Sequence, residues 1–185
     1  MVEIVTLTIN PALDVSTSVK KMMPFTKMRC APAHRDPGGG GINVARVLRR
    51  LGIDATAIYP AGGATGQLLA GLVEREGVRS IVIPAANDTR EDLTIFDETT
   101  REQFRLVFPG ALLGDTEWQA CLQSLARITP APAFVIASGS LPAGVPHDFF
   151  GKVAQASKAH SKVIVDTSGP FLKSARNIPV QLQGI

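Results

Sequence analysis

The chain has 185 residues, of which 45% are hydrophobic and 19% are charged. This length suits one domain with a substantial core, and the composition excludes a disordered chain. The formal net charge is +3, but the basic residues form no stripe, so we expect no nucleic-acid partner. No apolar stretch approaches the roughly 20 residues that span a bilayer, and no secretory signal opens the chain. We therefore expect a soluble, cytoplasmic protein that contacts no membrane.

The two cysteines, Cys30 and Cys121, stand far apart in the sequence. Neither has a partner at the spacing of a disulfide framework or a metal-binding motif. We therefore expect both to be buried thiols.

Helical and strand-like periodicities alternate along most of the chain. Continuous apolar strands between amphipathic helices are typical of a mainly parallel sheet with helices on both faces. We therefore predict a doubly wound α/β fold. In chain order, the expected elements are strand 3–9, a short edge strand near 29–34, helix 42–51, strand 55–59, helix 65–76, strand 80–83, helix 115–128, strand 134–137, helix 146–160 and strand 163–165.

Residues 90–108 depart from this alternation, because their apolar residues recur at every second position. Leu93 and Ile95 precede a turn at 99–100, and Leu106 follows it. Such alternation on either side of a short turn predicts an antiparallel hairpin. We expect this hairpin to project from the parallel sheet as an insertion.

A run of four glycines, Gly38 to Gly41, opens the first predicted helix. Its backbone N–H groups and the helix N-terminus can bind a polar or anionic ligand. The run is not a P-loop, because Ile42-Asn43 stands where Lys-Ser/Thr is required. A dinucleotide-binding loop would leave the first strand directly, whereas this run lies far beyond it. Two interpretations remain: a ligand-binding loop, which we favour, and a tight connection that only glycine can make.

Three polar residues allow two interpretations each. Asn43 could cap the helix that follows the glycine run, or contact ligand hydroxyls through its amide. Asp14 could close the turn after the first strand, or accept hydrogen bonds from a ligand at the carboxyl edge of the sheet. Ser140 could bond the backbone of its own turn, or touch a substrate. The residues alone leave these alternatives open.

Four segments resemble, in order and spacing, the signatures of the PfkB carbohydrate kinases, which have the ribokinase-like fold. PGGGGINVAR at residues 37–46 resembles the first signature of the family. The others are TINPALD at 8–14, SGSLPAGVP at 138–146 and VDTSG at 165–169.

Within the family, PAGGATG at 60–66 and FPGA at 108–111 are most similar to the minor bacterial type of 6-phosphofructokinase. This resemblance implies ATP-dependent phosphorylation of fructose 6-phosphate to fructose 1,6-bisphosphate in glycolysis, with ATP and Mg2+ as cofactors. Fructose-1-phosphate and tagatose-6-phosphate kinases are close relatives and give the alternative activities.

The resemblance also assigns a sugar-phosphate site. Asp14 matches a carboxylate that accepts hydrogen bonds from sugar hydroxyls. Arg90 and Arg105, on the two arms of the hairpin, match groups that bind the phosphate, although without the resemblance two solvated surface arginines would be the better interpretation. The implied substrate-binding residues are Asp14, Gly39, Gly40, Gly41, Asn43, Arg90, Arg105 and Ser140, with Lys27 approaching the phosphates.

A small β-lid, made by insertions at about 12–36 and 88–110, is implied as well. In this family the lids of two chains commonly pack against each other, so the resemblance implies a homodimer through the lid. The family's Gly-Ala-Gly-Asp stretch, which supplies the catalytic base, and its Asn-x-x-Glu element, which helps organise magnesium, do not occur in the sequence. We therefore expect residues 1–185 to be the N-terminal part of a ribokinase-like kinase domain, lacking the main ATP and Mg2+ sites and inactive alone.

Two functions of other classes compete with this one. A non-catalytic sugar-phosphate-binding protein would use the same site without turnover. An NAD(P)-dependent oxidoreductase is suggested only by the α/β pattern and the glycines, and the position of the glycine run disfavours it.

Overall fold

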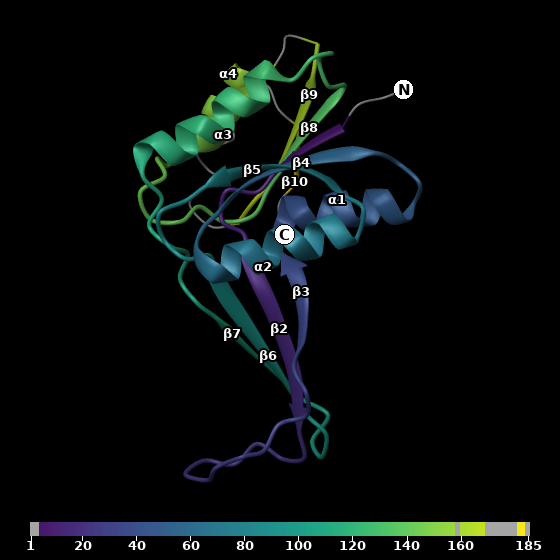
Figure 1. Ribbon diagram of the computed structural model, residues 1–185, viewed down its shortest axis with the longest axis vertical. Coiled ribbons are helices and arrows are strands. Elements are labelled where there is room, and N and C mark those ends of the chain that lie inside the picture. The colour runs from purple at the N-terminus through teal and green to yellow at the C-terminus, as the bar shows by residue number, and fades with distance from the viewer. Residues whose placement is uncertain (1–3, 158–159, 169–180, 184–185) are drawn as a thin grey trace.

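The computed structural model describes residues 4–157, 160–168 and 181–183. Strands and helices alternate along it, with a second group of strands inserted between them (Figure 1). In chain order the elements are β1 (Ile4–Leu7), β2 (Ala12–Val19), β3 (His34–Gly38), α1 (Gly40–Arg50), β4 (Ala55–Ala61), α2 (Gly63–Arg75), β5 (Arg79–Pro84), β6 (Arg90–Asp97), β7 (Gln103–Val107), α3 (Asp115–Arg127), β8 (Phe134–Ser138), α4 (Phe149–Ala156), β9 (Lys162–Asp166) and β10 (Gln181–Gln183).

The main sheet has six parallel strands in the order β10-β9-β8-β1-β4-β5. Helices α1 and α2 cover one face and α3 and α4 the other (Figure 1). In β4, Ile58 packs into the core beneath α3 and α4, whereas Ala57 and Tyr59 pack beneath α1 and α2. Successive side chains of a strand point to opposite faces, so one apolar strand contributes to both cores. The predicted doubly wound α/β fold is confirmed.

Four other strands form a second sheet, which we call the lid, in the order β3-β2-β6-β7. Strand β2 pairs antiparallel with β3 and parallel with β6, and β6 pairs antiparallel with β7. The chain enters the lid from the carboxyl end of β1 and returns through β3 into α1, so the lid projects from the carboxyl edge of the main sheet (Figure 1). The predicted hairpin is confirmed as β6 and β7.

Two lid strands differ from the sequence prediction. Strand β2 was not expected, because Ser and Thr alternate with its apolar residues and give the segment a polar composition; Leu13, Val15 and Val19 are nevertheless buried. The edge strand expected near 29–34 lies instead at His34–Gly38, because pairing with β2 begins only at His34, opposite Ser16.

Two smaller expectations also need correction. Helix α4 begins at Phe149 rather than near 146, because the preceding residues form turns in which Gly144 has a φ of 88°. It ends at Ala156, and residues 158–159 of the expected helix lie outside the described part.

Of the two cysteines, Cys121 is buried as expected, whereas Cys30 is exposed, because it lies in the long lid loop between β2 and β3. Burial raises the pKa of the Cys121 thiol to about 12. No helix in the described residues is long and apolar enough to cross a membrane.

Candidate functional site

The carboxyl ends of three neighbouring strands form the edge of the main sheet next to the glycine run. Thr8 follows β1, Ser138 ends β8 and Asp166 ends β9. The Ser138 hydroxyl donates a hydrogen bond of 2.8 Å to the Asp166 carboxylate. The Thr8 hydroxyl accepts one of 2.8 Å from the backbone N–H of Ile42, at the start of α1. The helix N-terminus is therefore tied directly to the edge of the sheet.

The glycine run lies so close to this edge that it leaves no room for side chains. A Cβ atom on Gly40 would lie 2.1 Å from the Ser138 hydroxyl oxygen, and one on Gly39 would lie 2.6 Å from the Thr8 methyl group. Gly39 also has a φ of 111°, a conformation that favours glycine. The close packing and the positive φ thus explain why this connection consists of glycines.

A cavity of about 400 Å³ lies between the lid and α1. The sheet register explains its polar character: Asp14 pairs with Asp36 on one side and with Asp92 on the other, so three carboxylates share one face of the lid. The charged and amide residues that line the cavity are Asp14, Asp36, Asp92 and Arg105 from the lid, and Asn43, Arg46 and Arg50 from α1.

The surroundings of Asp14 in this cavity disfavour its charged form. Burial and the nearby Asp92 carboxylate raise the pKa of Asp14, and the cations of Arg105, Arg90 and Arg46 oppose that rise only in part. A raised pKa means that neighbouring donors do not fully stabilise the ionised carboxylate. The group can therefore accept hydrogen bonds from a ligand.

The two arginines of the predicted phosphate site have different surroundings. Arg105 is exposed and lines the cavity. Arg90 does not line it; its Nη1 lies 3.1 Å from each carboxylate oxygen of Asp92 and donates a hydrogen bond of 2.9 Å to the carbonyl of Phe108. The Arg90 Nε is buried and has no hydrogen-bond partner among the residues that the structure describes. Arg105 is therefore at the cavity, whereas the Arg90 guanidinium is held by the carboxylate of Asp92 on β6 and by the carbonyl of Phe108, the residue after β7.

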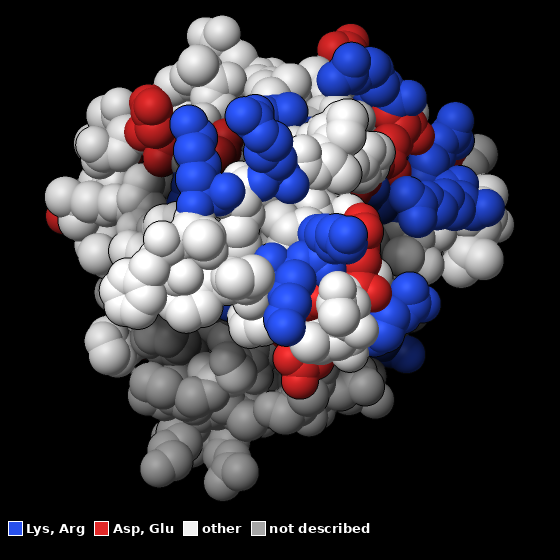
Figure 2. Space-filling model, turned by 90° about the horizontal axis from the view of Figure 1, so that it is seen from below, with Lys and Arg blue, Asp and Glu red and all other residues white. Residues whose placement is uncertain are grey.

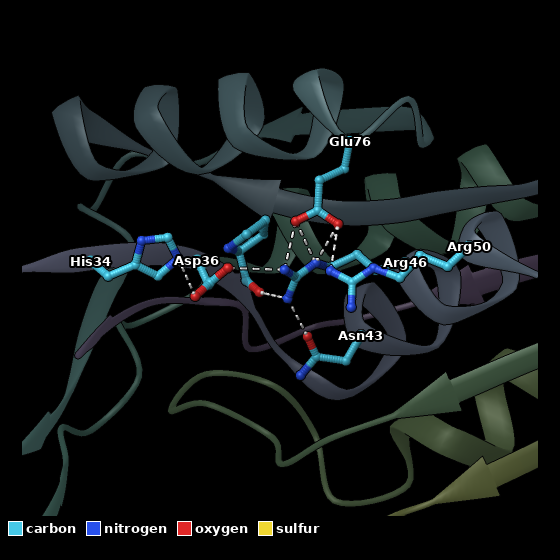
Figure 3. A network of polar contacts seen from close by, with 7 residues as sticks. His34, Asp36, Asn43, Arg46, Arg50 and Glu76 are labelled. Atoms are coloured by element: carbon cyan, nitrogen blue, oxygen red, sulfur yellow. Dashed lines mark hydrogen bonds and ion pairs between the residues drawn. The ribbon is translucent and has the colours of Figure 1, made fainter. Parts of the chain in front are cut away.

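Arg46 is a site residue to which sequence reasoning gave no role. Its guanidinium lies at the centre of a network, between Glu76, Asp36 and Asn43 (Figure 3). Its Nε lies 2.9 Å from both carboxylate oxygens of Glu76, 30 positions further along the chain. No local sequence pattern links two residues at that separation, so the sequence offers no signal for the pair.

Six of the nine predicted site residues do not line the cavity: Gly39, Gly40, Gly41, Arg90, Ser140 and Lys27. Ser140 is exposed, and its hydroxyl accepts a hydrogen bond of 2.9 Å from the amide of Asn10, not from the local backbone. Lys27 is exposed in the loop between β2 and β3. This loop extends to the end of the lid far from the main sheet (Figure 1). The cavity thus brings together Asp14, Asn43 and Arg105, but neither Ser140 nor Lys27.

Charges of both signs are interspersed at the lid end of the molecule. Figure 2 shows Lys and Arg side chains next to Asp and Glu side chains, rather than in one continuous basic patch. Within residues 4–157, 160–168 and 181–183, no group of three or more His, Cys, Asp or Glu side chains could hold a metal ion. The donors described do not fit a magnesium site, so we derive no chemical step through a metal from these residues.

The sequence matches the pfkB family of carbohydrate kinases over residues 3–181. The chain belongs to this family. It is 49% identical over 171 residues to the ATP-dependent 6-phosphofructokinase isozyme 2 of Mycobacterium tuberculosis, a match covering 92% of this chain and 50% of that protein. It is 42% identical over 176 residues to the enzyme of the same name from Escherichia coli, covering 95% and 57%.

The fold agrees with solved structures of this pfkB family. The crystal structure of phosphofructokinase-2 from Escherichia coli in complex with fructose-6-phosphate matches with a TM-score of 0.89 and 41% identity, over 95% of this chain and 58% of that chain. The pfkB chain described here spans about half the length of the curated relatives it matches. The predicted membership of the PfkB kinases and the predicted ribokinase-like fold are both confirmed.

Proposed function

We propose that this chain carries the sugar-phosphate site of an ATP-dependent 6-phosphofructokinase, which converts fructose 6-phosphate to fructose 1,6-bisphosphate. The observation that carries the proposal is the placement of Asp14 and Arg105 on one face of the lid, in one cavity. A carboxylate accepts hydrogen bonds from sugar hydroxyls, and a guanidinium pairs with a phosphate group. The names of the relatives from Mycobacterium tuberculosis and Escherichia coli support fructose 6-phosphate as the substrate.

Each proposed contact has a structural basis. Asp14 accepts hydrogen bonds from sugar hydroxyls, and the N–H groups of the Asn43 amide donate to the sugar phosphate. Arg105 binds the phosphate directly, because its guanidinium lines the cavity. Arg90 can join it through a guanidinium nitrogen other than Nη1, which Asp92 and Phe108 already engage. A contact from Lys27 requires the lid of a second chain, because its own loop lies at the far end of the lid.

The lid also supports a homodimer. Its second face carries the cross-strand apolar pairs Leu93–Leu106 and Ile95–Phe104. Phe104 and Leu106 are 38% and 45% exposed. An exposed apolar sheet face with unpaired edge strands favours association, and we propose that two lids pack through this face.

ATP and Mg2+ belong to the proposed reaction, but the described residues provide no metal-binding cluster through which to derive a step. The sequence contains no Gly-Ala-Gly-Asp stretch to supply the base for the acceptor hydroxyl. We therefore propose that the 185-residue chain binds the sugar phosphate without turning it over. Release of ADP above background by the purified chain, with fructose 6-phosphate and MgATP, would contradict this.

A calorimetric titration of two arginine variants tests the site. Arg105→Met removes a guanidinium that lines the cavity, and Arg101→Met is the matched control, because Arg101 lies in the turn of the same hairpin against the Phe96 ring. Loss of a charge-assisted contact weakens binding about tenfold or more, so we expect that loss for fructose 6-phosphate with Arg105→Met only. Equal affinities for the two variants would contradict the proposed phosphate site.

A further inference from the structure

We infer that Arg46 is a positioning residue, which orients the amide of Asn43 in the cavity and fastens lid strand β3 to helices α1 and α2. The inference deepens the proposed function and depends on it for the identity of the ligand. It concerns the geometry of the site rather than direct contact with the substrate.

The orientation of Asn43 follows from the chemistry of its neighbour. The Arg46 Nη1 lies 3.1 Å from the Asn43 side chain. A guanidinium has only donors, so the amide atom that faces it must be the oxygen, Oδ1. In Figure 3, Oδ1 points to Arg46 and the amide nitrogen points away from it. Asn43 lines the cavity, so its two N–H donors remain available to a ligand there.

The same guanidinium joins three elements of the structure. Its Nη1 donates a hydrogen bond of 2.8 Å to the carbonyl of Pro37, and its Nη2 lies 3.1 Å from the Asp36 carboxylate; both residues belong to β3. Glu76, which caps the end of α2, receives the hydrogen bonds from Nε. Arg46 itself is on α1. Arg46 therefore links β3 to α1 and α2, in addition to the pairing of β3 with β2.

Arg46 has no donor left for a substrate phosphate. Of the five N–H groups of a guanidinium, Nε binds Glu76, the two of Nη1 bind Pro37 and Asn43, and the two of Nη2 bind Asp36 and Glu76. The hydrogen bonds also lower the pKa of Glu76 and raise that of Arg46, so both groups remain ionised. The side chain is only 12% exposed. These features distinguish Arg46 from Arg105 and assign it an indirect role.

A double-mutant cycle on fructose 6-phosphate affinity tests the inference. We expect Arg46→Met and Asn43→Ala each to weaken binding about tenfold, as loss of a charge-assisted or ligand hydrogen bond does. Because part of the effect of Arg46 passes through Asn43, the loss in the double variant should be smaller than the product of the two single losses. Losses that multiply, or an unchanged affinity in Arg46→Met, would overturn the inference.

Two further variants separate positioning from a general effect of charge or fold. Arg49→Met is the matched control, since Arg49 is on the same helix and pairs with Asp54 at an exposed site; its affinity should stay within about twofold of the wild type. Arg46→Lys keeps a positive charge beside Glu76 and should therefore keep the fold, but it lacks the planar guanidinium whose Nη1 reaches Asn43. We expect Arg46→Lys to remain weak, and recovery of wild-type affinity would contradict a positioning role.

A readout without ligand keeps the inference separate from the proposed function. If the wild-type chain binds no sugar phosphate, the proposed function fails. The side-chain amide protons of Asn43 then still report on its orientation in the ligand-free chain by NMR. Arg46→Met and Arg46→Lys should shift these resonances and Arg49→Met should not. Unchanged resonances in all three variants would overturn the inference on their own.

Discussion

The carboxyl group of Asp14 occupies the space that a side chain on Gly38 would need. A Cβ atom at Gly38 would lie 2.5 Å from the carboxyl carbon and from both oxygens of Asp14. Asp14 is on β2 and Gly38 is the last residue of β3, the adjacent antiparallel strand. Gly39, Gly40 and Gly41 follow Gly38 directly in the chain. The absence of a side chain at Gly38 therefore sets the position of the carboxylate that we assign to the sugar.

Gly38→Ala should impair binding more than stability. The atoms in the way are the end of a short side chain, so the carboxylate can rotate away at small cost, but it then leaves its place in the cavity. We expect fructose 6-phosphate affinity to fall about tenfold or more, while the free energy of unfolding falls by less than about 1 kcal/mol. Calorimetry and urea denaturation measure the two effects. Gly71→Ala, on α2 with open space around its Cβ, is the control and should leave binding unchanged.

Gly40→Ala should lower the free energy of unfolding more clearly than Gly38→Ala does. Its Cβ would meet the backbone carbon of Ser138 at 2.8 Å as well as the hydroxyl, and the strand end cannot move as a side chain does. Overpacking of this kind costs about 1–3 kcal/mol of unfolding free energy. Urea denaturation of Gly40→Ala should show that loss. A stability equal to that of Gly71→Ala would contradict the close packing of the glycine run on the sheet.

Asp14→Asn should stabilise the protein while weakening binding. Because burial raises the pKa of Asp14 in the folded state, ionisation destabilises the fold above that pKa, and the penalty disappears as the pH falls through it. The variant should unfold at higher urea concentration than the wild type at pH 7, with the difference shrinking toward about pH 4. Its affinity for fructose 6-phosphate should be about tenfold lower. A destabilised variant at pH 7 would contradict the assignment.

Asp92→Asn should strengthen binding. The carboxylate of Asp92 pairs with Arg90 and raises the pKa of Asp14, so it competes with a phosphate for the cation and disfavours the ionised Asp14. An asparagine can still accept the hydrogen bond of 3.0 Å from the Phe108 N–H. We expect affinity for fructose 6-phosphate to rise about threefold or more. Glu91→Gln, on the same strand but the opposite face, should leave it unchanged; equal effects in both variants would refute a local role.

Phe104→Glu should weaken the proposed homodimer. A buried charge in an apolar contact raises the dissociation constant about tenfold or more. Sedimentation velocity over a range of protein concentrations measures this constant. Val47→Glu, at an apolar side chain of α1 that is 52% exposed, is the control. Identical sedimentation of the two variants and the wild type would exclude the lid face as the interface.

The fold was predictable where local periodicity was strong. Strand β4 and the hairpin of β6 and β7 each carry an apolar pattern that identifies them without knowledge of their neighbours. Strand β2 was missed because its partners supply the burial: Val15 and Val19 are apolar, but the serines and threonines between them give the segment a loop-like composition.

The site was predictable only in part, because it depends on tertiary contacts. Asp14 and Arg105 do line the same cavity, whereas Arg90 forms an ion pair with Asp92. Only the three-dimensional arrangement shows this difference between the two arginines. The meeting of Asp14 with Asp92 depends on the register between β2 and β6, which no local pattern encodes. The ion pair between Arg46 and Glu76 likewise exists only after α1 and α2 have packed together.

The most direct test of the account is a calorimetric titration of the 185-residue chain with fructose 6-phosphate, with fructose 1-phosphate and free fructose as controls. The account predicts saturable binding of fructose 6-phosphate, and binding at least about tenfold weaker for both controls, because only the first ligand offers its phosphate to Arg105 while its hydroxyls reach Asp14. Equal affinities for the three compounds, or no binding by a chain shown to be folded, would contradict it.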